Sequence, residues 1–155
     1  MDNSDAFDLT DFTPYLLNLA AETSSLDFQP NYKDTYGMLR TEWRVLFHLG
    51  RYGTMTAKDI CDRARVHKTK VSRAVAALEV KRFLKRAEMT HDRRHAMLSL
   101  TTAGVAAFRD LNVAAREFDA ILMADFSKSE RDVLRRCLAI FLKVDCDDAV
   151  LVCGA

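Results

Sequence analysis

The chain has 155 residues, and its 23 basic and 22 acidic side chains nearly cancel. With 49% apolar and 29% charged residues, it has the composition of an ordinary soluble protein, long enough for one domain with its own core. No apolar run is long enough for a membrane-spanning helix, and the acidic N-terminus does not resemble a signal peptide, so we expect a cytoplasmic protein.

The N-terminal region is predicted to be helical. Residues 1–8 are polar and acidic, and we expect them to be disordered. Between residues 10 and 27, apolar positions recur at alternating spacings of four and three, which is typical of an amphipathic helix. Pro30 is expected to kink or break this helix, leaving a short helix over 31–36 that ends at Gly37.

Two further helices are predicted before the most basic part of the chain. The first covers 41–52, where Leu46 and Leu49 contribute to one apolar face. The second covers 57–63, with Thr56 as its N-terminal cap. Residues 65–66 would make the turn into the next helix, so the arrangement predicts the supporting half of a helix-turn-helix.

The helix that begins near His67 has two contrasting faces. Val71, Val75 and Leu78 fall on one face, at spacings of four and three. The opposite face is small, polar and basic, which allows close approach to DNA, donors for base edges and cations for phosphates. We assign to the major groove Thr69, Lys70, Ser72 and Arg73, with Lys68 at its edge.

Positive charge is concentrated around this helix. Residues 63–95 hold eleven Lys or Arg and three acidic residues, a local net charge of +8, whereas the whole chain carries +1 and the remainder therefore −7. Such a gathering indicates a face that binds a polyanion. A solvated basic surface is the alternative, and the helical phasing favours DNA.

A two-stranded hairpin is predicted next. Leu98 and Leu100 alternate with Ser99, the period of a half-buried strand, and residues 83–90 form the other strand. The polar residues 91–94 are expected at the tip. An arginine at such a tip can enter the minor groove of DNA, where negative potential is concentrated.

The C-terminal region is predicted to form two long helices. Thr101 or Thr102 would cap a helix to about residue 125, whose apolar seam has a mean period of 3.5 residues. Ser127 and Glu130 form a capping box that opens the last helix. These helices and the N-terminal one offer more apolar surface than a compact winged helix needs. They form either a monomeric core or, as we expect, an interface with a second copy.

Several segments, in order and spacing, resemble the MarR family of winged helix-turn-helix regulators, over about residues 9 to 143. The matching segments are Glu42-Trp43-Arg44-Val45-Leu46, Lys68-Thr69-Lys70-Val71-Ser72-Arg73-Ala74-Val75, Leu78-Glu79, Asp92-Arg93-Arg94 and Leu100-Thr101-Thr102-Ala103-Gly104. No single segment is specific, but together they are.

The resemblance implies a mainly α fold with a small β-hairpin wing. The winged helix-turn-helix would cover 39–100, flanked by dimerisation helices over 9–38 and 101–146 and followed by a tail over 147–155. It also implies a sequence-specific transcriptional repressor that binds double-stranded DNA as a homodimer. Its two recognition helices would lie roughly 34 Å apart on a near-palindromic operator.

Roles in the wing follow from the same resemblance. Arg94 would enter the minor groove, held in place by Asp92. Lys85, Arg86 and Arg93 are expected to meet phosphates. Many family members have glycine where this chain has Arg82, so either the recognition helix ends differently here or Arg82 is strained, with an added phosphate contact as a further alternative.

The family also binds small anionic or phenolic effectors, which weaken DNA binding. The candidate pocket residues are Tyr15, Tyr36, Trp43, Arg44 and His48. Each has a plainer interpretation: core filling for the tyrosines and the tryptophan, an ion pair for Arg44, and a hydrogen-bonded core histidine for His48.

No enzyme motif is present: the chain lacks a Gly-rich phosphate loop, GxSxG and HExxH, so we expect no catalysis, no cofactor and no metal. His91 and His95 flank the expected tip and are assigned to solvent or phosphate rather than to a metal.

Two other functions stay open. The four cysteines, Cys61, Cys137, Cys146 and Cys153, have no CxxC spacing, but a thiol-based regulator that uses the C-terminal three is an alternative. The other alternative is a protein-interaction module with only non-specific affinity for DNA.

Overall fold

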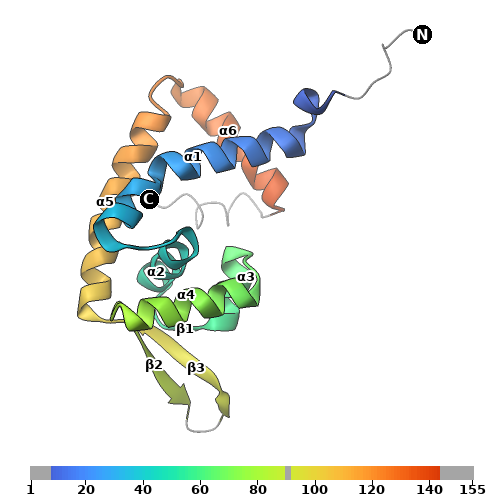
Figure 1. The fold of residues 1–155 in the computed structure, drawn as a ribbon. Helices are drawn as coiled ribbons and strands as arrows, with labels where there is room; N and C mark the ends of the chain where they lie inside the picture. The colour runs from blue at the N-terminus through green and yellow to red at the C-terminus, as the bar shows by residue number, and fades with distance from the viewer. Residues whose placement is uncertain (1–7, 90–91, 144–155) are drawn as a thin grey trace. The chain divides into compact units, whose positions relative to one another are not determined.

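The computed structural model describes residues 8–89 and 92–143, and side chains at 88–95 lie outside the described part. The elements are η1 (Leu9–Asp11), α1 (Thr13–Tyr36), α2 (Arg40–Tyr52), β1 (Met55–Thr56), α3 (Ala57–Ala64), α4 (Lys68–Val80), β2 (Leu84–Met89), β3 (Asp92–Leu100), α5 (Thr102–Leu122) and α6 (Lys128–Leu142) (Figure 1). The chain divides into two compact units, Met1–Ala115 and Arg116–Ala155, and α5 runs from the first into the second. The mainly α winged helix-turn-helix fold is therefore confirmed.

Helices α2, α3 and α4 enclose the core of the first unit. Leu46 of α2, Ile60 of α3, and Val71 and Leu78 of α4 each expose 1% or less of their surface. Burying such a side chain contributes about 1.5–3 kcal/mol, so these few contacts hold the three helices together. The apolar face expected for the recognition helix is thus the face that packs.

The wing belongs to a three-stranded antiparallel sheet in the order β1-β3-β2. Leu84 pairs with Leu100, and Met55 of β1 pairs with Leu98. The sequence pattern did not indicate β1, which has two residues. The expected tip over 91–94 was too long: pairing continues to Met89 opposite Asp92, so 92–94 belong to β3.

Helix α1 is continuous through Pro30, so a break at this proline, with a separate helix over 31–36, is wrong. Proline removes one backbone hydrogen bond and its ring crowds the preceding turn. Packing on both sides compensates, because Phe28 and Tyr32 are buried and their ring centroids lie 5.2 and 5.7 Å from that of Trp43 on α2. The helix ends where expected, with Gly37 in the left-handed conformation.

The start of α5 is fixed against the wing and against α2. Thr101 caps it, since its hydroxyl accepts a hydrogen bond from the Gly104 amide at 3.1 Å. A Cβ atom at Gly104 would lie 1.9 Å from the Phe83 carbonyl oxygen, and one at Gly50 would lie 2.3 Å from the Phe108 ring. Both glycines are therefore required for close packing.

In the second unit, α6 opens with the expected capping box, in which Ser127 and Glu130 each accept a backbone hydrogen bond from the other. None of the helices in the described ranges is long and apolar enough to cross a membrane.

Candidate nucleic-acid interface

The exposed face of α4 carries the side chains expected at the major groove. His67 caps the helix, with its Nδ1 accepting a hydrogen bond from the Thr69 amide at 3.3 Å. Val71, Ala74, Val75 and Leu78 are buried. All five residues assigned from the sequence are exposed on the other side: Lys68, Thr69, Lys70, Ser72 and Arg73.

The turn before α4 is tight. Arg65 ends α3 in the left-handed conformation, with φ of 50°, and the Val66 amide donates to the Cys61 carbonyl at 3.2 Å. The capping box of Thr56 and Asp59 fixes the other end of α3. Helix α3 is therefore held at both ends and supports α4 from behind.

The two basic residues of β2 differ in their surroundings. Lys85 and Arg86 are both exposed. The Arg86 Nε donates to the Glu79 carboxylate of α4 at 2.9 Å, with each side chain about 40% exposed. A DNA phosphate would have to compete with Glu79 for the Arg86 guanidinium. Of the two basic side chains, Lys85 is therefore better placed to bind a phosphate.

The backbone of Asp92, Arg93 and Arg94 lies on β3, but their side chains are outside the described part. The minor-groove role of Arg94 and the phosphate role of Arg93 therefore stay predictions. His91 also lies outside the described residues.

The backbone conformation of Arg82 shows how α4 ends without the glycine that many family members have at this position. It has a φ of 62°, in the left-handed region that favours glycine. The Arg82 amide donates to the Glu79 carbonyl at 3.0 Å, and the Phe83 amide donates to the Leu78 carbonyl at 2.9 Å. This is the Schellman ending. The helix keeps the glycine-type ending, and Arg82 is the strained residue.

The five candidate effector residues differ in their surroundings. Trp43 contacts Phe28, Tyr32 and Phe47, as core filling would. Tyr36 instead donates its hydroxyl to Asp110 at 2.7 Å. Burial and this hydrogen bond raise its pKa to about 12. Tyr15 is half-buried and Arg44 is exposed.

His48 differs from the hydrogen-bonded core histidine that we expected. It is half-buried and stacks on Tyr52, with ring centroids 5.8 Å apart. Its buried Nδ1 has no hydrogen-bond partner among the residues the structure describes. Burial lowers the pKa of His48, and the positive charges of Arg63 and Arg44 lower it further.

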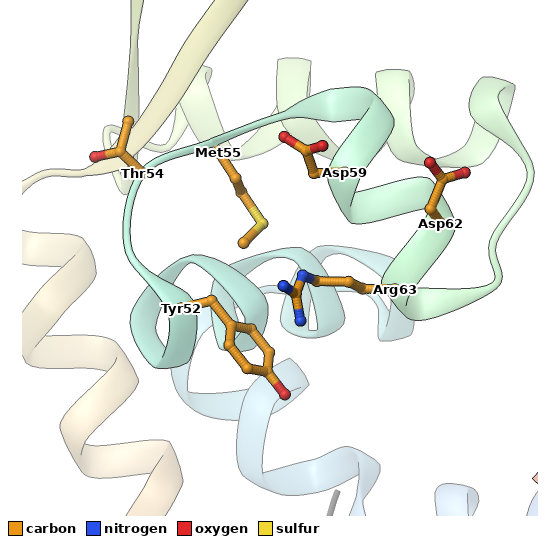
Figure 2. Close-up of a pocket in the computed structure, with 6 residues that line it drawn as sticks. All are labelled: Tyr52, Thr54, Met55, Asp59, Asp62 and Arg63. Atoms are coloured by element: carbon orange, nitrogen blue, oxygen red, sulfur yellow. The ribbon is translucent and has the colours of Figure 1, made fainter. Parts of the chain in front are cut away.

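A cavity of about 550 Å³ lies where α2 ends and α3 packs (Figure 2). Its lining residues are Tyr52, Thr54, Met55, Asp59, Asp62 and Arg63. The Arg63 guanidinium carbon lies 4.4 Å from the Tyr52 ring centroid. In Figure 2 the carboxylates of Asp59 and Asp62 point away from Tyr52. None of the five expected effector residues lines this cavity.

Two cysteines can be placed. Cys61 on α3 and Cys137 on α6 are half-buried and not in a disulfide, whereas Cys146 and Cys153 lie outside the described residues. Within ranges 8–89 and 92–143, no three His, Cys, Asp or Glu side chains come together as a metal site would require.

Comparison with known proteins agrees with this geometry. The profile of the MarR family matches residues 36–95, from the end of α1 into the wing. An uncharacterized HTH-type transcriptional regulator of Mycobacterium bovis is 30% identical over 98 residues, which is 63% of this chain and 68% of that protein. The chain belongs to the MarR family.

Two other similarities extend over more of the chain. The uncharacterized HTH-type regulator YwoH of Bacillus subtilis is 26% identical over 110 residues, 71% of this chain and 80% of that protein. The structure of BpsR from Bordetella bronchiseptica, whose DNA binding is regulated by 6-hydroxynicotinic acid, matches with a TM-score of 0.80 and 18% identity, over 90% of this chain and 99% of that one. At that identity the match shows a shared fold.

Proposed function

We propose that this MarR-family regulator reads a near-palindromic operator as a homodimer and represses transcription from it. The observation that carries the proposal is the exposed face of α4, where hydroxyl and cationic side chains stand on a helix whose other face is buried in the core. Such a helix fits the major groove. Lys85 on β2 adds a cation for the flanking phosphates.

The apolar side chains of the terminal helices support a second copy as partner. Helix α1 exposes Leu16, Leu19 and Leu26 by 44–50% of their surface. Helix α6 exposes Val133, Leu134, Leu138, Ile140 and Phe141 by 38–64%. A monomer rarely leaves so much apolar surface in contact with water, and burying it between two copies removes that cost.

A small aromatic or anionic compound would bind near His48 and Arg44 and weaken operator binding. The unpartnered Nδ1 of His48 offers a polar contact, and Arg44 offers positive charge. BpsR, which has the same fold, responds to a small aromatic acid.

The test of the proposed function is a selection of random duplex DNA by the purified protein, followed by titration of the selected sequence against salt. We expect a near-palindrome of about 16–20 base pairs, bound at least about 10³-fold better than random DNA. If no sequence is enriched and binding depends only on salt, the proposal fails and a protein-interaction module becomes the better account.

Dimerisation is tested by sedimentation of Leu19→Glu and Leu138→Glu. Each variant places a charge in the proposed interface and should be monomeric at concentrations where the wild type is dimeric. The control is Val80→Glu, because Val80 is 83% exposed at the end of α4, outside the terminal helices. A wild type that sediments as a monomer would exclude the dimer.

A further inference from the structure

Three helix ends meet at one ion pair in the first unit. Lys81 caps the C-terminal end of α4. Its Nζ donates to the carboxylate of Glu42, in the first turn of α2, and to the carbonyl oxygen of Gly37, the C-terminal cap of α1, at 2.7 Å. The sequence pattern gave no indication of this junction, because the three residues are up to 44 positions apart.

The signs of the charges match the helix dipoles. The C-terminal end of a helix carries partial negative charge and its N-terminal end partial positive charge. The ammonium of Lys81 stands at the C-terminal ends of α4 and α1, and the Glu42 carboxylate stands at the N-terminal end of α2. Each charge is therefore stabilised by the backbone as well as by its partner.

The pair is also shielded from water. The Glu42 side chain is 6% exposed and the Lys81 side chain 29%. Of the buried residues in the described ranges, Glu42 is the one with a charged side chain. A carboxylate so placed needs its cation, since an unpaired buried charge is strongly unfavourable. The Lys81 ammonium cannot therefore leave this position without cost, as a surface lysine could.

We infer that Lys81 is a positioning residue: it fixes α4 against the corner between α1 and α2, and so sets how the recognition helix enters the groove. The inference rests on the proposed function. The rings of Tyr36 and Phe83 make a second contact at the same corner, with their centroids 5.9 Å apart. This contact keeps the C-terminal end of α1 next to the segment that follows α4. The ion pair adds to this contact, because a hydrogen bond between two charged groups is about twice as strong as one between neutral groups.

This role differs measurably from that of a phosphate contact. A phosphate-binding lysine lowers affinity for all sequences and reduces the salt slope by about one when it is removed. A positioning lysine, already engaged within the protein, should leave random-DNA binding and the salt slope unchanged. Its removal should instead lower operator affinity, because base contacts depend on the placement of α4.

The experiment compares Lys81→Met with Lys85→Ala, using the selected operator and a random duplex of equal length. For Lys81→Met we expect operator affinity to fall by roughly 10- to 100-fold, the loss that follows from one disrupted base contact. Random-DNA affinity and the salt slope should stay at wild-type values. Lys85→Ala should lower both affinities together, and Lys81→Arg should recover part of the operator affinity.

Glu42→Gln and the double variant Glu42→Gln/Lys81→Met complete the test. The double variant leaves no unpaired buried charge, so it can be measured even if Lys81→Met unfolds. Its loss of operator affinity should not exceed the sum of the losses caused by the two single substitutions. It should still discriminate less well than the wild type between the operator and random DNA.

Each remaining outcome is decisive. Unchanged operator affinity in Lys81→Met, or in the double variant where Lys81→Met does not fold, overturns the inference. A parallel loss on both duplexes with a reduced salt slope also overturns it and makes Lys81 a phosphate contact. A wild type that selects no operator removes the proposed function and this inference with it, whereas normal selection with an unaffected Lys81→Met removes the inference alone.

Discussion

The carbonyl oxygen of Arg82 accepts a hydrogen bond from the Thr101 hydroxyl at 2.7 Å, and it does so from a left-handed backbone conformation. This contact joins Arg82, which follows the C-terminal cap of α4, to Thr101, the residue that caps α5. The strain at Arg82 is therefore retained where the recognition helix, the wing and α5 meet.

Replacing Arg82 by glycine should stabilise the protein. Relief of the left-handed strain exceeds the entropy that glycine adds to the unfolded chain, so we expect a gain of about 0.5–1 kcal/mol. Urea unfolding with an unchanged m-value would show it. The same change in mid-helix, Arg73→Gly, is the control and should lower stability by about 1 kcal/mol. No gain for Arg82→Gly would mean that the arginine side chain contributes to stability.

Lys85 and Arg86 should respond differently to alanine. We expect Lys85→Ala to weaken binding to all sequences and to lower the salt slope by about one. Arg86→Ala should have a smaller effect, because Arg86 is already paired with Glu79. Titrations of operator and random duplex over a range of salt would measure both. A loss confined to the operator for Lys85→Ala would contradict its assignment to phosphate.

Arg94→Ala should weaken operator binding by roughly 1–3 kcal/mol, the contribution of one specific contact. The expectation comes from the Asp92-Arg93-Arg94 segment and its position on β3. Arg93→Ala, the neighbouring change, should weaken all sequences about equally. Equal affinity of Arg94→Ala and wild type at matched salt would remove Arg94 from the minor-groove role.

His48 should make the protein less stable in mild acid. Burial and the charges of Arg63 and Arg44 lower its pKa in the folded state. The unfolded state therefore binds the proton first, and stability falls as the pH drops from about 6.5, the ordinary value, toward the lowered pKa. Unfolding midpoints from pH 7.5 to 5 should fall less in His48→Gln. Arg63→Gln should raise the His48 pKa observed by NMR; an unmoved resonance titration would contradict the electrostatic cause.

Tyr36 should ionise only in strongly alkaline solution. Its pKa is raised to about 12, first by burial and then by the hydrogen bond to Asp110. Because the folded pKa lies above the ordinary value, its stabilising effect is present below pH 10 and is lost as the pH rises toward 12. A rapid pH-jump absorbance titration should show this step, and Tyr36→Phe should remove it. Asp110→Asn should shift the step to lower pH.

Local signals in the sequence determined most of the elements of this protein. The apolar phase of α4, the caps at Thr56 and Ser127 and the stop at Gly37 all depend on residues within about one helical turn of each other. The exposed basic face of α4 follows from the same phase, since a helix that buries Val71, Val75 and Leu78 must turn Arg73 to solvent.

Tertiary structure decided what depends on residues far apart in the chain. Helix α1 continues through Pro30 because Trp43, thirteen positions further on, packs against both flanking turns. Strand β1 forms because the backbone at Met55 pairs with that at Leu98 of β3. From the sequence alone, Lys81 is one of the eleven basic residues in the window 63–95. Only the folded structure shows that its ammonium lies between Glu42 and Gly37. A charge pattern records how many cations are present, whereas the partner of each is fixed by which helix ends meet.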